Sequence, residues 1–364
     1  MGDGDAVAGV PRGGPSRGHP RFRGAPAPLR RPGNGNVANM SLAWTRISIG
    51  AALITGTLAL LAADVAIDER LGAAVSPCFW LLLLAVLALA AWETGRMLRL
   101  KGHPCRPGVA TAFTAILVAC AWAEVTDRAS GGASAGPVSL ARWSHVAGLN
   151  AYVMALALLV LLVYTLEVVA VERPGLVGTK PRSAGATPGG DMGRAATSAA
   201  WTILTVLSVG LLGTFLARVR FFPGPYGWSG LAYLLLVLGT VKVGDIGAWA
   251  IGSTLGRHAL VPTLSPKKTW EGLGGGMAGG VAAALAIGCG WLGFSWGAMA
   301  LFGLAVSAAG VLGDLGESLI KRACGVKDSG PIPGFGGALD ILDSLLGAAP
   351  VAYFALVLLT GEAQ

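Results

Sequence analysis

The sequence predicts an all-α fold, namely a polytopic integral membrane protein with about nine transmembrane helices. Apolar residues make up 54% of the 364-residue chain, while charged residues make up only 13%. An ordinary soluble domain carries roughly 25% charged residues. The apolar residues are also gathered into runs close to the ~20 residues that one transmembrane helix needs. Together these observations indicate that most of the chain lies in a membrane.

The apolar runs can be marked in order along the chain. They cover residues 46–67, 76–94, 108–125, 145–170, 196–217, 229–255, 273–293, 297–314 and 344–360. The eighth run is short and follows the seventh after only a few residues. We expect residues 41–195 to form an N-terminal transmembrane region. Residues 196–364 are then a C-terminal transmembrane region, which we expect to carry the functional site because the polar motifs fall there.

Residues 1–40 have a different composition from the rest of the chain. They are rich in Pro, Gly and Arg and poor in large apolar side chains. Such a segment cannot bury enough apolar surface to fold, so we expect a disordered tail. Its arginines favour a cytoplasmic location, where anionic lipid is available for contact.

The net charge is +8, and its distribution along the chain predicts an orientation. The basic residues gather in four segments on one side of an alternating path, namely 95–108, 171–195, 256–272 and 314–343. The positive-inside rule places this side in the cytoplasm, with the N-terminus inside and the C-terminus outside. Arg218 and Arg220 are exceptions on the opposite side. No nucleic-acid-binding signature occurs, so the charge indicates topology together with anionic lipid or an anionic substrate.

A first polar motif, GDLGESLIKR, covers residues 313–322. If the eighth helix continues past the membrane surface, the polar side chains of this motif share one helix face. They are Asp314, Glu317, Ser318, Lys321 and Arg322. Carboxylates bind Mg²⁺ and cations bind phosphate, so this face suits a metal–phosphate complex. A solvated helix end with ion pairs is the alternative.

A second motif, GVKDSGPIPGFGGALDILDS, covers residues 325–344. Its prolines and glycines exclude a helix in the middle and favour a loop whose backbone N–H groups can approach phosphate. Asp340 and Asp343 follow at the start of the last span, three residues apart. Capping aspartates in an interfacial loop are the alternative. Placing acidic side chains in an apolar, membrane-spanning run costs free energy, so their presence favours a functional role.

Three further stretches are polar or unusually rich in glycine. In SPKKTWEG (265–272), Lys267 and Lys268 either bind a polyphosphate or only set the membrane topology. VKVGDIGAW (241–249) places Lys242 and Asp245 inside an apolar run, as an ion pair or a functional site. In GLGGGMAGG (272–280) the glycines recur every four residues, which favours close helix packing over phosphate binding. The GK[ST] ending of a P-loop is absent.

In their order and spacing, SPKKTWEG, GDLGESLIKR and KDSG…PG.GG.LD..DS resemble the phosphatidate cytidylyltransferases, also called CDP-diacylglycerol synthases. The resemblance is good over residues 244–350, while the N-terminal half matches only as apolar spans. It implies an enzyme of phospholipid biosynthesis that transfers CMP from CTP to phosphatidate in the cytoplasmic (inner) membrane. The resemblance also implies Mg²⁺, beside which a potassium ion can sit, and a homodimer in membrane lipid.

Matching positions of this family assign roles to individual residues. The implied catalytic residues are Asp314, Asp340, Asp343 and Lys327. The implied metal ligands are Asp314, Asp340, Asp343, Ser318 and Asp245. Substrate contacts are expected from Ser265, Lys267, Lys268, Lys321, Arg322, Gly336 and Gly337. Cations are needed in such a site because both reactants are polyanions, which repel each other.

The sequence departs from the family pattern in the second motif. Phe335 stands in place of a histidine, Ile341 in place of an arginine, and the loop is one residue shorter. Cytidylyl transfer to another lipid or isoprenoid phosphate is therefore an alternative, and so is a non-catalytic relative that acts as a membrane partner. A transporter that uses Lys242 and Asp245 is a third alternative. Against transport, the first half lacks the matching polar set that inverted repeats would provide.

Overall fold

The computed structural model describes residues 52, 55–70, 76–129, 151–172, 188–223, 230–330 and 336–361. Within these ranges the chain is helical apart from one small hairpin and short connections. Seven of the described helical segments are long and apolar enough to cross a membrane. The prediction of an all-α membrane protein is thereby confirmed. The predicted disordered tail, residues 1–40, lies outside the described residues.

The elements below belong to one unit of the chain, Thr45–Gln364. After a helix at 55–70, the α-helices are α2 (Pro77–Leu100), α3 (Pro107–Ala129), α5 (Ala151–Glu172), α6 (Pro188–Thr205), α7 (Leu212–Arg220), α8 (Gly230–Leu255), α9 (Trp270–Ala284), α10 (Trp296–Ala323) and α11 (Ala338–Thr360). Two π-helical segments, η1 (Val206–Leu211) and η2 (Leu285–Cys289), join α6 to α7 and extend α9. The strands β1 (Ala259–Val261) and β2 (Ser265–Thr269) form an antiparallel hairpin.

The predicted apolar runs coincide with helices, and two of the helices that extend beyond their runs thereby include polar motifs. Helix α10 continues to Ala323, nine residues past the predicted end at 314, so the motif GDLGESLIKR is helical. Helix α11 begins at Ala338, before the predicted start at 344, and therefore includes both aspartates of the second motif. Both extensions arise because backbone hydrogen bonds continue a helix into polar sequence beyond the end of the apolar run. The predicted boundary at 195/196 falls inside α6, and the division into two transmembrane regions stays a prediction.

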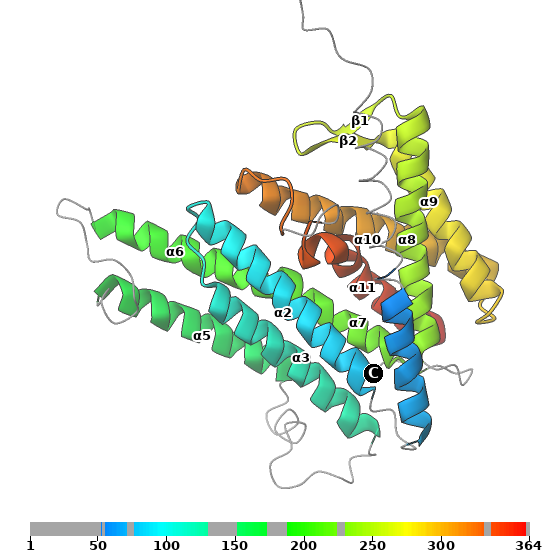
Figure 1. Ribbon diagram of the computed structural model, residues 1–364, viewed down its shortest axis with the longest axis horizontal. Helices are drawn as coiled ribbons and strands as arrows, with labels where there is room; N and C mark the ends of the chain where they lie inside the picture. The colour runs from blue at the N-terminus through cyan, green and yellow to red at the C-terminus, as the bar shows by residue number, and fades with distance from the viewer. Residues whose placement is uncertain are drawn as a thin grey trace, which may run out of the picture. The chain divides into compact units, whose positions relative to one another are not determined.

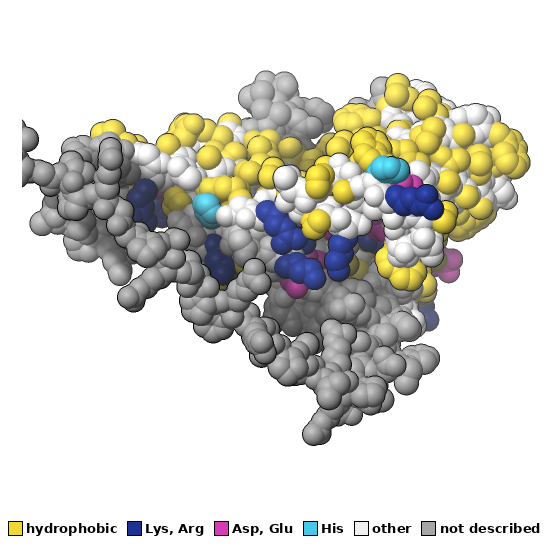
Figure 2. All heavy atoms as spheres, turned by 90° about the horizontal axis from the view of Figure 1, so that it is seen from above, with side chains coloured by type: hydrophobic (Ala, Val, Ile, Leu, Met, Phe, Trp, Pro, Cys, Tyr) yellow, Lys and Arg dark blue, Asp and Glu magenta, His cyan; other side chains and the backbone are white. Residues whose placement is uncertain are grey.

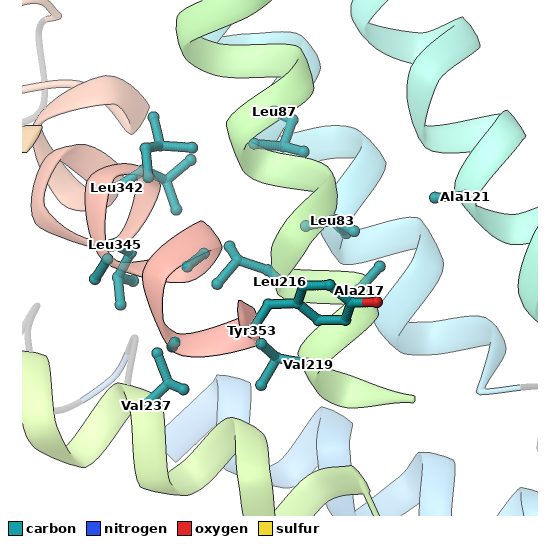
Figure 3. Close-up of a cluster of buried hydrophobic side chains, with 14 of the residues drawn as sticks. Leu83, Leu87, Ala121, Leu216, Ala217, Val219, Val237, Leu342, Leu345 and Tyr353 are labelled. Carbon is teal, nitrogen blue, oxygen red and sulfur yellow. The ribbon is translucent and has the colours of Figure 1, made fainter. Parts of the chain in front are cut away.

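The buried core lies where α2, α7, α8 and α11 meet (Figure 3). Leu83 and Leu87 of α2 face Leu216 of α7, and Leu345 and Tyr353 of α11 complete the cluster. Each of these side chains is buried. Helix α11, which carries the last two aspartates, is therefore packed against helices from both halves of the chain.

Helices α8 and α9 run side by side, with the β1–β2 hairpin between them in sequence (Figure 1). Glycines line their contact: a Cβ built on Gly244 would lie 3.2 Å from the carbonyl oxygen of Gly276, and one on Gly275 would lie 2.8 Å from that of Gly247. Larger residues would force the two backbones apart. The predicted packing role of the glycine repeat is confirmed.

Candidate active site

A pocket of about 540 Å³ lies beside the hairpin, where α8, β2, α9, α10 and α11 converge. Its polar lining consists of Lys242, Asp245, Ser253, Lys267, Lys268, Thr269, Asp314, Asp340, Asp343 and Ser344. Figure 2 looks onto the end of the molecule that carries the hairpin, and it shows basic side chains, with acidic ones among them, gathered beside an apolar surface. The fold thus brings residues from all four polar motifs to one pocket.

Three carboxylates form the acidic centre of this region. One oxygen each from Asp314, Glu317 and Asp343 lies within 4.8 Å of the other two. Asp314 and Glu317 are three residues apart on α10 and share a face. Asp343 reaches them because glycines let α11 approach α10: a Cβ built on Gly313 would lie 2.9 Å from the backbone nitrogen of Gly347.

The donor set of this carboxylate group fits a divalent cation. The Glu317 residue is only 5% exposed, and neither of its carboxylate oxygens accepts a hydrogen bond from the described residues. The nearest cation is the Lys321 ammonium, whose Nζ lies 3.1 Å from Oε1. Buried carboxylates without donors are costly unless a cation compensates them. Several carboxylate oxygens at one point are the ligands that hard cations such as Mg²⁺ prefer.

Glu317 is absent from the metal ligands expected from the sequence, although it was placed on the correct helix face. Its spacing of three residues from Asp314 is the signal that could have identified it. Ser318, which was expected as a ligand, donates a hydrogen bond to Asp314 Oδ1 at 3.5 Å. It therefore lies next to the carboxylate group.

Asp340 lines the pocket, but its carboxylate is directed at other partners. Oδ1 accepts a bond from Lys321 Nζ at 2.6 Å, and Oδ2 accepts the backbone N–H groups of Ser329 at 2.9 Å and Gly337 at 2.8 Å. The Ser329 hydroxyl donates to the same oxygen. The structure thus uses Asp340 to hold the two ends of the loop between α10 and α11. Its expected role as a metal ligand stays a prediction.

Asp245 lines the same pocket from α8, also outside the group of three carboxylates. Its Oδ2 accepts a bond from Lys242 Nζ at 3.3 Å, and its Oδ1 accepts one from the Ser344 hydroxyl at 3.4 Å. Lys242 and Asp245 are each nearly half exposed, with side-chain exposures of 46% and 44%. Helices α8 and α11 are therefore linked at the pocket by polar contacts.

The hairpin delivers two lysines to the pocket. Lys267 and Lys268 lie on β2 and line the pocket, and Lys268 Nζ is 2.5 Å from Asp314 Oδ2. At the base of the hairpin Glu271 contacts His258 Nδ1 at 2.5 Å and accepts the His258 backbone N–H at 3.3 Å. The Thr269 hydroxyl accepts the N–H of Gly272 and caps α9. These contacts fix the hairpin relative to α9.

Several expected substrate-binding residues lie outside the pocket lining. Lys321 is paired with Glu317 and Asp340. Arg322 donates to the backbone carbonyls of Leu264 and Val326, at 3.2 and 3.1 Å, and thereby ties the hairpin turn to the end of α10. The remaining substrate-binding positions are Ser265 at the start of β2, and Gly336 and Gly337 before α11. Lys327, which was expected to be catalytic, is exposed and also lies outside the pocket lining. Phe335 lies outside the described residues, whereas Ile341 is half-buried in α11.

Comparison with known proteins places this pocket in a family context. The phosphatidate cytidylyltransferase of Mycobacterium tuberculosis is 34% identical over 183 residues, which are 50% of this chain and 53% of the relative. That of Synechocystis is 42% identical over 134 residues (36% and 45%), and that of Staphylococcus aureus 38% over 162 residues (44% and 59%). The chain thus spans about half the length of the curated relatives it matches. The model of the cytidylyltransferase family matches residues 44–359, so the chain belongs to the cytidylyltransferase family.

Proposed function

We propose that this protein is a phosphatidate cytidylyltransferase, which transfers CMP from CTP to phosphatidate and forms CDP-diacylglycerol and pyrophosphate. The observation that carries the proposal is the carboxylate group Asp314, Glu317 and Asp343 in one region with Lys267 and Lys268. This region lies on helices apolar enough to span a membrane, as an enzyme with a lipid substrate requires. The names of the relatives from three bacterial lineages support the same reaction.

The chemistry of the reaction explains why these residue types are needed. An oxygen of the lipid phosphate forms a bond to the α-phosphorus of CTP, while the bond from that phosphorus to the bridging oxygen of pyrophosphate breaks. Mg²⁺ bound by Asp314, Glu317 and Asp343 would neutralise negative charge on the phosphate oxygens. Lys267 and Lys268 bind the departing pyrophosphate through charge-assisted hydrogen bonds. The nucleophile is already an anion, so the pocket needs no general base.

The proposed cofactors are Mg²⁺ and, beside it, K⁺. The ligand oxygens for the second cation would come from Asp245 and Ser344, which are hydrogen-bonded to each other and line the same pocket. The test is cation replacement in the transfer assay, with K⁺ exchanged for a bulky organic cation at constant Mg²⁺. Unchanged turnover would remove K⁺ from the proposal, whereas activity after complete chelation of divalent cations would remove Mg²⁺.

The activity itself is tested with purified protein, labelled CTP, phosphatidate and Mg²⁺. We expect a lipid-soluble cytidine product and stoichiometric pyrophosphate. A parallel arm replaces phosphatidate by an isoprenoid phosphate, because half-buried Ile341 stands where the family pattern has an arginine. Product only in that arm would identify an isoprenoid phosphate, and not phosphatidate, as the substrate. The absence of product with any lipid phosphate would contradict the enzyme assignment.

We further propose nine spans, with the helix at 55–70 and α5 added to the seven long apolar helices, and with the N-terminus inside. The pocket then faces the cytoplasm of the inner membrane, where CTP is found. A cysteine introduced as Lys327→Cys in a cysteine-free variant reports this side. An impermeant thiol reagent should label it in inside-out vesicles only, and labelling from outside sealed cells would refute the orientation. The proposed homodimer is tested by the mass of the protein in detergent.

A further inference from the structure

The start of helix α11 is held by a residue from a distant part of the chain. Its N-cap is Gly337, which has no side chain to accept the first free N–H groups of the helix. The backbone N–H of Leu339 instead donates to Glu93 Oε2 of α2 at 3.3 Å. A carboxylate is favourable at this point because the helix N-terminus carries a partial positive charge.

The Glu93 carboxylate is enclosed by both ends of the loop that joins α10 to α11. A Cβ built on Gly330 would lie 2.9 Å from Glu93 Oε1, and one built on Gly337 would lie 2.8 Å from its Cδ. A side chain at Gly330 would meet both this carboxylate and the Gly337 backbone, and one at Gly337 would meet the carboxylate and the Ser329 hydroxyl. Glu93 therefore contacts the loop before and after its central residues, as well as the first turn of α11.

This contact bears on the carboxylate group because Asp343 lies in the second turn of α11. Asp343 must approach Asp314 and Glu317 of α10 for the three oxygens to lie within 4.8 Å of one another. The position of Asp343 depends on where α11 begins and at what angle. Among the described residues outside α11 and its preceding loop, Glu93 bonds the first turn at Leu339, and Lys321 of α10 bonds it at Asp340.

We propose that Glu93 is a positioning residue of the active site, which fixes the start of α11 and thereby the geometry of the cation-binding carboxylates. The effect on turnover rests on the proposed function, whereas the effect on cation binding does not. A similar contact elsewhere provides a comparison: Asp64 accepts the N–H groups of Cys78 and Phe79 at 2.8 and 2.7 Å, at the start of α2. That cap lies about 15 residues from Glu93 along α2, or ~22 Å.

The test measures Mn²⁺ binding to purified protein in detergent, by the spin-resonance signal of free Mn²⁺, alongside thermal unfolding and cytidylyl transfer. Outer residues that position metal ligands typically change metal affinity by roughly 10–100-fold, and we expect this loss for Glu93→Ala. Glu93→Gln keeps an acceptor oxygen and should bind Mn²⁺ within a few-fold of wild type. The matched controls are Asp64→Asn, which should lower stability without weakening Mn²⁺ binding, and exposed Glu69→Gln, which should change neither.

Wild-type Mn²⁺ affinity in Glu93→Ala would overturn the proposal. It would also be overturned if Asp64→Asn weakened Mn²⁺ binding as much as Glu93→Ala at equal loss of stability. The weaker binding would then follow from lower stability in general, and not from the position of Glu93. If Glu93→Ala does not fold, Glu93→Asp serves as the second variant and should weaken Mn²⁺ binding, because its shorter side chain draws the carboxylate back from the Leu339 N–H. Wild-type protein that binds Mn²⁺ but transfers no CMP would refute the proposed function, and the Mn²⁺ series would still decide the role of Glu93.

Discussion

Replacement of Gly313 by alanine should separate the two helices that carry the carboxylate group. The new Cβ would lie 2.9 Å from the backbone nitrogen of Gly347, whereas ordinary van der Waals contact begins at 3.4 Å. The difference between these distances is 0.5 Å, and the carbonyl oxygen of Asp343 is closer still. Helices α10 and α11 must therefore move apart by at least this amount, because backbone atoms of a helix cannot turn aside.

The Gly313→Ala change should lower both the stability of the protein and its turnover. Overpacking of a well-packed interface destabilises by about 1–3 kcal/mol. The same movement shifts Asp343 relative to Asp314, and a 1 Å misplacement in an active site can cost roughly 100-fold in rate. If the loss scales with displacement, a shift of half an ångström corresponds to about tenfold. We therefore expect turnover to fall by about tenfold in protein that is still folded.

Transfer from labelled CTP and thermal unfolding in detergent measure the two losses separately. Gly316→Ala is the matched control, since Gly316 lies on the same helix, is exposed, and has no atom within 4 Å of a built Cβ. It should keep full activity and gain about 0.5–1 kcal/mol from helix propensity. Wild-type turnover and stability in Gly313→Ala would refute the packing argument, as would an equal loss in Gly316→Ala.

Further predictions concern the carboxylates, the hairpin and the thiols. Asp343→Asn should lower transfer by at least about 100-fold at normal expression, because cation-held charge stabilisation is worth several kcal/mol; near-normal transfer would exclude it as a ligand. Glu271→Gln should loosen the hairpin and raise the KM for CTP by roughly tenfold, or about 1.4 kcal/mol, and a change in kcat alone would contradict this. Burial raises the pKa of the Cys105 and Cys324 thiols, so a thiol reagent should label them slowly at neutral pH, faster as pH rises, and fully after unfolding. Rapid labelling of the folded protein at neutral pH would contradict this expectation.

The helices could be predicted because their signals are local. A run of apolar residues specifies a span by itself, and the glycine repeat of α9 specifies a packing face by its spacing of four residues. The helical face of the motif GDLGESLIKR followed from the same periodicity. The hairpin between α8 and α9 was missed because its strands are short, contain Pro266, and lack the alternation of apolar and polar residues that indicates a strand.

The contacts within the site could not be predicted, because they depend on how helices far apart in sequence pack. Nothing in the sequence around Glu93 indicates that it reaches the start of α11, 246 residues away in the chain. The separation of roles between Asp340 and Asp343 was equally hidden. The two residues were expected to act alike, yet one bonds Lys321 and the loop while the other joins Asp314. Sequence spacing restricts which helix face a residue occupies, but not what the face meets.

Lys321 connects Glu317 of the carboxylate group to Asp340, which holds the loop before α11. This position changes the interpretation of the basic residues on α10. Its ammonium lies 3.1 Å from Glu317 Oε1 and 2.6 Å from Asp340 Oδ1, and its side chain is only 13% exposed. A lysine that is nearly buried between two carboxylates has little capacity left for a phosphate, whereas Lys267 lines the pocket and is exposed. The geometry therefore favours Lys321 as the residue that couples the carboxylates proposed to bind a cation to the loop before α11. We therefore propose that the substrate phosphates bind the lysines of the hairpin. Because Asp340 also binds both ends of that loop, a movement of the loop would be transmitted through Lys321 to Glu317.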